Sequence, residues 1–238
     1  MRILHFKILA VGDVHGYKYL PLFRASVSSL LNIQPKLIIF AGDMVDEGNV
    51  LELRPIVNIV TRKFSSIKII AVFGNEEYHE LEDRFIKEYP EILWLNDSYT
   101  IVDINGVKLG IVGSRGSLER LTFWQRRNKP ELEKVYKERP LKIKEMLLKL
   151  KTMSDVTILV THYAPTFITV YGEPFKVYPY MGSRDFERVI KEAKPNIVIH
   201  AHAHNSRVVE ASIGLSKIYN VSLPARKGVT LIDINVIK

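Results

Sequence analysis

Aspartate, histidine and asparagine side chains follow the ends of several apolar runs in this chain. Asp13 and His15 lie on a glycine-flanked turn directly after the run Ile8–Val11. Carboxylate oxygens and imidazole nitrogens together suit Mn, Fe, Zn, Ni or Co better than Ca or a thiolate-preferring metal. Seven side chains of this kind are too many for one ion and are suited to two. The candidate ligands are Asp13, His15, Asp43, Asn75, His162, His202 and His204.

These side chains can meet only if the apolar runs form neighbouring strands. The near-continuous apolar character of the runs is typical of strands covered on both faces. Strands that alternate with helices imply parallel pairing through right-handed crossovers, and ligands bind outside the carboxyl ends of such strands. The first half of the chain is therefore predicted to be α/β. The predicted strands are 3–11, 36–41, 67–73, 155–160 and 196–199, with helices over 17–32 and 49–64.

The middle and the end of the chain have a different pattern. Asn105-Gly106 between two apolar runs predicts a β-hairpin of 99–104 and 107–112, after a short strand at 92–95. Such a hairpin introduces antiparallel strands, so a second or mixed sheet is expected. The remaining predictions are a loop or short helix at 122–128, a helix over 131–150, a helix capped by Ser183, and antiparallel strands at 208–210, 217–219 and 229–234.

Length and composition favour one globular domain over 1–238. The chain has 238 residues with 47% hydrophobic content, enough to bury a sizeable core. No apolar run reaches the roughly 18–20 residues that span a bilayer, and the first residues lack the apolar region of a signal peptide. Cysteine is absent, which excludes disulfides and thiolate metal sites. We expect a cytoplasmic protein without membrane partners.

Positive charge is concentrated in one partly helical segment, at about 115–151. Twelve Lys and Arg face five acids there, a balance of +7 in a chain of net charge +8. Three interpretations stay open: a solvated helix face, a positive wall over the active site, or a nucleic-acid surface in which Phe123 and Trp124 stack on bases. Arg115 is the cation expected nearest to the metals.

The ordered motifs resemble the calcineurin-like metallophosphoesterase superfamily, in particular the small prokaryotic phosphoesterases related to cyclic-nucleotide phosphodiesterases. The resemblance covers residues 8 to about 204, and the segment 219–224 is also similar to the family. It implies a four-layer α/β/β/α sandwich of two mixed β-sheets flanked by helices. The motifs are Asp13-x-His15, Gly42-Asp43-x-x-Asp46, Gly74-Asn75, His162 and His202-x-His204.

The resemblance also implies a role for each candidate ligand. Asp13, His15 and His204 would hold one divalent ion, Asn75, His162 and His202 would hold the second, and Asp43 would bridge both. Manganese is the first expectation, with Fe, Zn, Ni, Co or Mg as alternatives. Two such ions would activate a bridging hydroxide for hydrolysis of a phosphoester. Asp46 is expected to support a ligand by hydrogen bonding.

Two positions depart from the family pattern. Glu76 stands where the family has a histidine that helps to protonate the leaving oxygen. A carboxylate beside cations stays ionised and donates no proton, so phosphodiesters or activated monoesters are the expected substrates. His79 could replace the missing histidine, although a surface position is the simpler interpretation. Ala201 replaces a glycine before the His pair, and His200 is expected to pack in its strand.

The predicted catalytic set is Asp43, Glu76 and Arg115, acting on a phosphorylated small molecule or a phosphodiester. Two other functions stay open from the sequence: a nuclease that uses the basic segment, or a catalytically weak metal-binding scaffold for protein partners. The oligomeric state is not predicted. Four tyrosines could line a ring-binding pocket or simply pack in the loop: Tyr163, Tyr171, Tyr178 and Tyr180.

Overall fold

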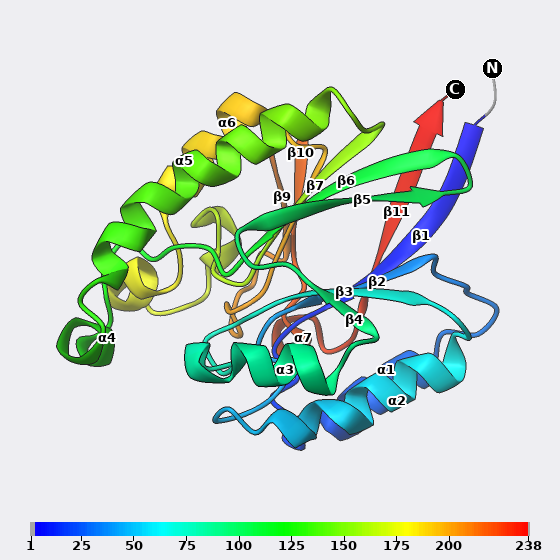
Figure 1. Ribbon diagram of the computed structural model, residues 1–238, viewed down its shortest axis with the longest axis horizontal. Coiled ribbons are helices and arrows are strands. Elements are labelled where there is room, and N and C mark those ends of the chain that lie inside the picture. Colours follow the sequence, from blue (N-terminus) through cyan, green and yellow to red (C-terminus); the bar gives the residue numbers. More distant parts are fainter. Residues whose placement is uncertain (1–2, 238) are drawn as a thin grey trace.

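Two mixed β-sheets stack face to face, and helices cover the outer face of each, in the computed structural model of residues 3–237 (Figure 1). The first sheet has the strand order β11-β1-β2-β3-β4. Its β11 strand runs antiparallel to β1, and the other neighbouring pairs are parallel. The strands are β1 (Ile3–Val11), β2 (Leu37–Ala41), β3 (Lys68–Val72), β4 (Ile92–Trp94) and β11 (Thr230–Ile237).

The second sheet has the order β5-β6-β7-β8-β10-β9. Its inner strands β6, β7, β8 and β10 are parallel, whereas β5 and β9 are antiparallel edge strands. The Asn105-Gly106 hairpin joins β5 to β6, as predicted. The strands are β5 (Ser98–Ile104), β6 (Val107–Ser114), β7 (Val156–Thr161), β8 (Ile197–His200), β9 (Glu210–Ile213) and β10 (Ser216–Asn220).

Helices form the two outer layers. On the first sheet lie α1 (Leu20–Ser28), α2 (Leu53–Lys63) and α3 (Glu82–Glu88), and on the second lie α5 (Leu132–Lys151) and α6 (Arg184–Ala193). Ser183 caps α6 by accepting the Asp185 N–H, as predicted. Short elements complete the chain: α4 (Phe123–Asn128), α7 (Leu223–Arg226), η1 (Val50–Glu52), η2 (His79–Leu81), η3 (Ile168–Val170) and η4 (Phe175–Tyr180).

The alternation of side chains along each strand explains the layers. Phe6, Ile8 and Ala10 of β1 point into the core between the two sheets. Leu9 and Val11 of the same strand point the other way, into the core beneath the helices α1 and α2. Because side chains alternate faces with a period of two, a strand with apolar residues at every position must be covered on both faces. The predicted four-layer α/β/β/α fold is confirmed.

The predictions for the end of the chain were partly wrong. Residues 208–210 lie mostly in a loop, and the strand there is β9 (Glu210–Ile213). β10 pairs in parallel with β8, and only its other edge is antiparallel, to β9. Alternating apolar residues identify a strand but carry no information on its direction, because both ladders use the same period. Within residues 3–237, no helix combines the length and apolarity needed to cross a bilayer.

The close approach of two strand ends generates a testable prediction. A Cβ atom at Gly12 would lie 2.5 Å from the Cβ of Ala201, although Gly12 itself lies outside the left-handed region. We expect Gly12→Ala to destabilise the fold by about 1–3 kcal/mol through overpacking. Urea unfolding of a double-mutant cycle measures the effect: adding Ala201→Gly should recover most of the loss. Equal instability of the single and double variants would contradict the contact.

Candidate metal centre

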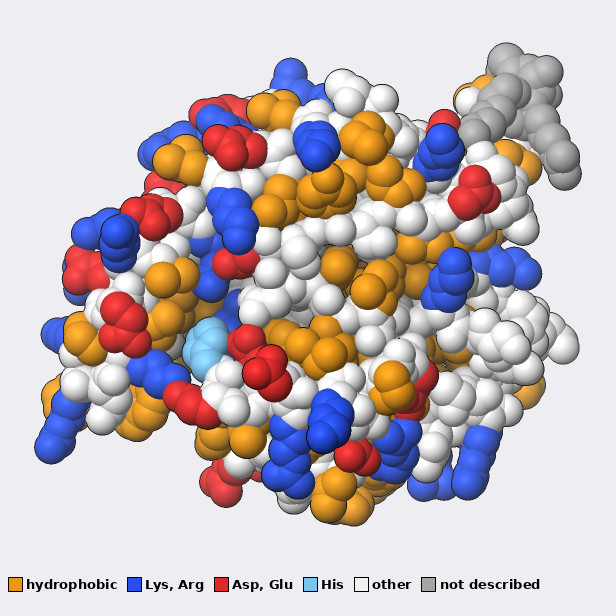
Figure 2. Space-filling view, viewed as in Figure 1, with side chains coloured by type: hydrophobic (Ala, Val, Ile, Leu, Met, Phe, Trp, Pro, Cys, Tyr) orange, Lys and Arg blue, Asp and Glu red, His pale blue; other side chains and the backbone are white. Residues whose placement is uncertain are grey.

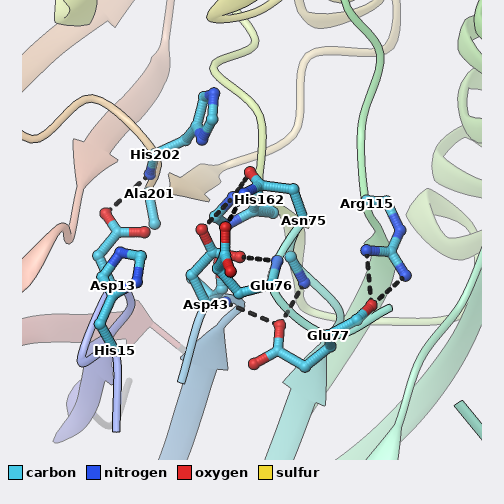
Figure 3. A network of polar contacts seen from close by, with 12 residues as sticks. Asp13, His15, Asp43, Asn75, Glu76, Glu77, Arg115, His162, Ala201 and His202 are labelled. Atoms are coloured by element: carbon cyan, nitrogen blue, oxygen red, sulfur yellow. Dashed lines mark hydrogen bonds and ion pairs between the residues drawn. The ribbon is translucent and has the colours of Figure 1, made fainter. Parts of the chain in front are cut away.

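The predicted ligands converge where the carboxyl ends of the two sheets meet (Figure 3). Five strand ends supply them: β1, β2 and β3 from the first sheet, and β7 and β8 from the second. Two groups form, and within each group the potential ligand atoms lie within 4.8 Å of one another. The first group is Asp13, His15 and His204, and the second is Asp43, His162 and His202.

Hydrogen bonds orient the side chains of the first group. His15 contacts Asp46 Oδ1 through Nδ1 at 3.1 Å, so its Nε2 faces inward. That Nε2 lies 3.5 Å from His204 Nε2, which in turn lies 3.4 Å from Asp13 Oδ2. A carboxylate behind an imidazole fixes the ring orientation and tautomer of a metal-binding histidine. The predicted supporting role of Asp46 is confirmed.

The second group is oriented in the same manner by backbone carbonyls. His162 Nδ1 donates to the carbonyl of Ala41 at 3.0 Å, so that its Nε2 faces Asp43 Oδ2 at 3.3 Å. The same Nε2 lies 3.0 Å from Asn75 Oδ1, which brings the seventh predicted ligand to this group. His202 Nε2 lies 3.3 Å from the carbonyl of Tyr180, which leaves Nδ1 as its lone-pair nitrogen.

Burial and mutual charge shift the pKa values of these groups. Burial alone would raise the pKa of Asp13, but the hydrogen bond and charge of His204 outweigh it and hold that pKa well below its usual range. Burial would lower the pKa of His162, whereas the charge of Asp43 raises it to about 9. Burial lowers the pKa of His202 to about 4. The centre therefore offers ionised carboxylates and, at His202, a neutral imidazole.

The donor set fits divalent ions. Asp13 Oδ1 is fully buried and makes no well-aligned hydrogen bond in the described structure, although the Ser222 hydroxyl also favours the charged form of this carboxylate. A buried polar atom without a well-aligned partner calls for an explanation, and a bound ion is one. Asp13, His15, Asp43 and His202 also adopt left-handed backbone conformations, with φ of 57°, 48°, 50° and 69°. Such strain in non-glycine residues clusters at functional sites. Oxygen and imidazole donors around a buried carboxylate oxygen together suit a transition metal.

Glu77 is a functional residue that the sequence analysis missed. Its side chain is 0% exposed, and its two carboxylate oxygens accept four backbone N–H groups. These donors belong to Asp43, Met44, Val45 and Gly74, at 2.8, 2.7, 3.3 and 2.7 Å. Glu77 thereby ties together the two loops that carry Asp43 and Asn75. In the sequence Glu76 and Glu77 are adjacent acids, and nothing in the pattern shows which of the two is buried and binds backbone N–H groups.

The carboxylate of Glu76 lies beside the second group without joining it. Its oxygens accept the backbone N–H of Glu47 and the side-chain amide of Asn75, both at 3.0 Å. Its backbone N–H donates to Asp43 Oδ1 at 2.8 Å. The carboxylate of Glu76 thus accepts one N–H group on each oxygen and is held beside Asp43 and Asn75.

Arg115 lies close to the centre but is engaged elsewhere. Its guanidinium donates to the carbonyl of Glu77 at 3.1 Å and to Glu82 Oε1 at 2.6 Å, and its side chain is buried (Figure 3). His79 also contacts Glu82, at 2.9 Å, from an exposed position. His200 packs within the fold, as expected, with its ring nitrogens at Thr169 and at the carbonyl of Ala201.

A cleft with a volume of about 700 Å³ opens beside Asn75 and His202. One wall comes from residues 118–132, the first part of the protruding segment 118–151, which we call the α4–α5 lobe. Figure 2 shows a hollow between this lobe and the rest of the molecule, with a histidine side chain (pale blue) inside it. The centre is therefore open to a ligand on the side of its second group.

Comparison with known proteins agrees with this geometry. A sequence model of the calcineurin-like phosphoesterases matches residues 6–206. Phosphopantetheinyl hydrolase from Mycobacterium tuberculosis has the same fold, with a TM-score of 0.68 and 17% identity over 93% of this chain and 90% of that one. A dimetal phosphatase from Danio rerio gives 0.58 and 12% over 90% and 86%.

The chain also resembles one part of a larger protein. NAD nucleotidase from Haemophilus influenzae matches with a TM-score of 0.60 and 11% identity, over 98% of this chain but only 53% of that one. No curated protein matches the sequence itself. At these identities the structural matches show a shared fold.

The four N–H contacts of Glu77 generate the second prediction. In Glu77→Gln, the amide NH₂ would face two backbone donors, so we expect a loss of about 2–4 kcal/mol in unfolding free energy. Glu76→Gln is the matched control, because its half-buried side chain accepts fewer bonds. Urea unfolding of both variants without metal checks the difference. Equal stability of the two variants would contradict the clamp.

Proposed function

This chain belongs to the calcineurin-like phosphoesterase family and is a metal-dependent phosphoric ester hydrolase, and we propose that it prefers phosphodiesters and activated phosphomonoesters. One observation carries the proposal: two adjoining groups of buried donors stand at the mouth of a cleft, and the carboxylate of Glu76 lies beside them at the position where the family pattern has a proton-donating histidine. The substrate preference follows from that carboxylate.

The proposed assignment of ligands keeps the two groups and adds Asn75. When bound, two divalent ions activate water and neutralise the charge of the phosphoryl group. Manganese is the first choice for this mixture of nitrogen and oxygen donors, followed by the other metals of similar preference. The assigned residues are Asp13, His15 and His204 for one ion, Asn75, His162 and His202 for the other, and Asp43 shared by both.

The chain's own residues contribute by positioning. Asp46 and the carbonyl of Ala41 hold the rings of His15 and His162, so that the Nε2 atom of each ring faces the other members of its ligand group. Glu77 holds the loop of Asp43 against the loop of Asn75. A centre held this way is preorganised, because its supporting hydrogen bonds exist before any ligand arrives.

Glu76 determines which phosphoesters the centre accepts. Two N–H groups hold its carboxylate in place, one on each oxygen, and a carboxylate in this arrangement acts as an acceptor and does not supply a proton to a leaving oxygen. Its negative charge repels a phosphomonoester dianion more strongly than a phosphodiester monoanion. An ester with a good leaving group needs no proton at all. Both effects favour diesters and activated monoesters over alkyl monoesters.

Metal dependence is the first test of the function. Chelation should abolish hydrolysis of a nitrophenyl phosphodiester, and added Mn²⁺ should restore it. We expect Asp43→Asn to lower kcat/KM by roughly 100-fold or more, because the shared carboxylate is worth several kcal/mol to the charge balance of the site. Asp83→Asn, on the exposed face of α3, is the matched control. Two bound ions without turnover on monoester, diester or nucleic acid would instead favour a scaffold.

The role of Glu76 gives a second, independent test. We expect the wild type to hydrolyse a nitrophenyl diester faster than an alkyl monoester, and Glu76→His to shift that ratio by roughly 10- to 100-fold toward the monoester. Glu76→Gln separates charge from proton donation, because it removes the repulsion without supplying an acid. A strong monoester preference in the wild type would refute the assigned role.

A further inference from the structure

We infer that the cleft beside the centre is a subsite for a planar aromatic group esterified to the phosphate, such as a nucleobase-bearing or aryl alcohol, with Trp124 as the residue that recognises it. The inference rests on the proposed function, because the phosphate must sit at the candidate metal centre for its substituent to enter the cleft. It goes further by assigning the chemical class of that substituent.

The size and position of the cleft fit one substituent of a small substrate. Its volume of about 700 Å³ lies within the roughly 300–1,000 Å³ of small-molecule sites. It starts at Asn75 and His202, which belong to the second ligand group, and reaches Trp124 on α4. A phosphoryl group at the centre would therefore direct one of its ester groups along this cleft.

Aromatic and aliphatic side chains form much of the lining. The ring of Tyr163 lies 4.9 Å from that of His202, so the aromatic surface begins directly at the ligand group. Tyr180 extends this aromatic surface. Leu118 and Leu132, which also line the cleft, pack with Tyr163 in a buried cluster. Flat, rigid side chains of this kind bind planar rings by stacking and edge contacts.

Trp124 is presented to the cleft on a fixed support. Thr122 and Gln125 cap α4 reciprocally, each accepting the other's backbone N–H at 3.1 and 3.0 Å. The Gln125 amide also donates to the hydroxyl of Tyr136 at 3.1 Å, which ties α4 to α5. The indole nevertheless stays 59% exposed. The helix backbone is thus anchored, and the indole that lines the cleft keeps an exposed ring surface on which a planar group can stack.

The charges along the cleft favour an uncharged ring over a second phosphate. Two cations line it, and both are already paired: Arg115 with Glu82 at 2.6 Å, and Lys129 with Glu80. A further anionic group would have to displace one of these carboxylates and would meet the negative charge of Glu76. A neutral aromatic group neither displaces a carboxylate from these ion pairs nor is repelled by Glu76.

The test compares two phosphodiesters that share an activated, non-aromatic leaving group, 2,2,2-trifluoroethanol, and differ in the second alcohol, 2-phenylethanol or 2-cyclohexylethanol, which have similar size. With Mn²⁺, we expect the wild type to prefer the phenyl ester, and Trp124→Ala to lower kcat/KM for that ester by roughly 5- to 100-fold while leaving the cyclohexyl ester nearly unchanged. Phe123→Ala is the matched control, because Phe123 is the adjacent aromatic, 77% exposed and outside the cleft lining. It should leave both esters unchanged.

A binding measurement keeps the subsite and the proposed function separable. Calorimetry on the Mn²⁺-loaded protein would compare the non-hydrolysable phenylethyl and cyclohexylethyl phosphonates, and Trp124→Ala should weaken only the phenyl compound. Selective binding without hydrolysis would support the subsite and refute the function. Hydrolysis without aromatic preference, or equal losses in Trp124→Ala and Phe123→Ala, would overturn the subsite alone. Adding the adenosine 5′-trifluoroethyl phosphodiester distinguishes a nucleobase from a simple aryl group.

Discussion

The burial of two carboxylates at the seam between the sheets is the constraint on which the surrounding structure depends. Asp13 and Asp43 are 0% and 1% exposed, and an isolated ionised carboxylate at such a position is strongly unfavourable. Each is compensated by imidazoles and by a backbone donor: the N–H of His202 bonds Asp13 at 2.9 Å, and that of Glu76 bonds Asp43 at 2.8 Å. Because these donors come from other strand ends, the carboxylates hold five connecting loops in one arrangement. Asp13 Oδ1 makes no well-aligned hydrogen bond in the described structure, so a cation bound there would add to this balance.

The same constraint explains why a third buried carboxylate is present. Asp43 follows Gly42, whose φ of 84° requires glycine, and adopts a left-handed conformation itself. Such a loop exposes consecutive N–H groups with no strand partner, and Glu77 accepts four donors from it and from Gly74. Burial and the charge of Asp43 raise the pKa of Glu77, whereas the four donors favour its ionised form. Divalent ions at the ligands would relieve the repulsion among these acids, so binding of metal and order in the loops are expected to reinforce each other.

Sequence alone predicted most of the strands, the α/β class and the residues that converge, because the seven predicted ligands follow five apolar runs and parallel strands place such ends together. The four layers and the division into two ligand groups came from the resemblance to a family. The direction of β10 and the position of β9 were wrong, since apolar alternation does not encode strand direction. The role of Glu77 could not be predicted from the sequence, because it depends on backbone N–H groups of the loop after β2, which is distant from Glu77 in the sequence. Arg115 lines the same cleft as Asn75 and His202, but its pairing with Glu82 required knowledge of where η2 and α3 lie.

The α4–α5 lobe shows why a sum of charges is a weak guide to a surface. From the sequence its excess of cations left three interpretations open: a solvated helix face, a positive wall or a nucleic-acid surface. In the structure several cations of α5 pair with nearby acids, Lys137 with Glu133 on the same helix and Lys144 with Glu192 of α6. Exposed pairs of this kind contribute little to binding or stability. The face toward the cleft carries Trp124 and two leucines, with Lys129 held by Glu80. The apolar inner face of the lobe borders the cleft beside Asn75 and His202. The strand ends thus bring the predicted ligands together, and in our proposal a segment without a predicted ligand of its own selects among the esters that reach them.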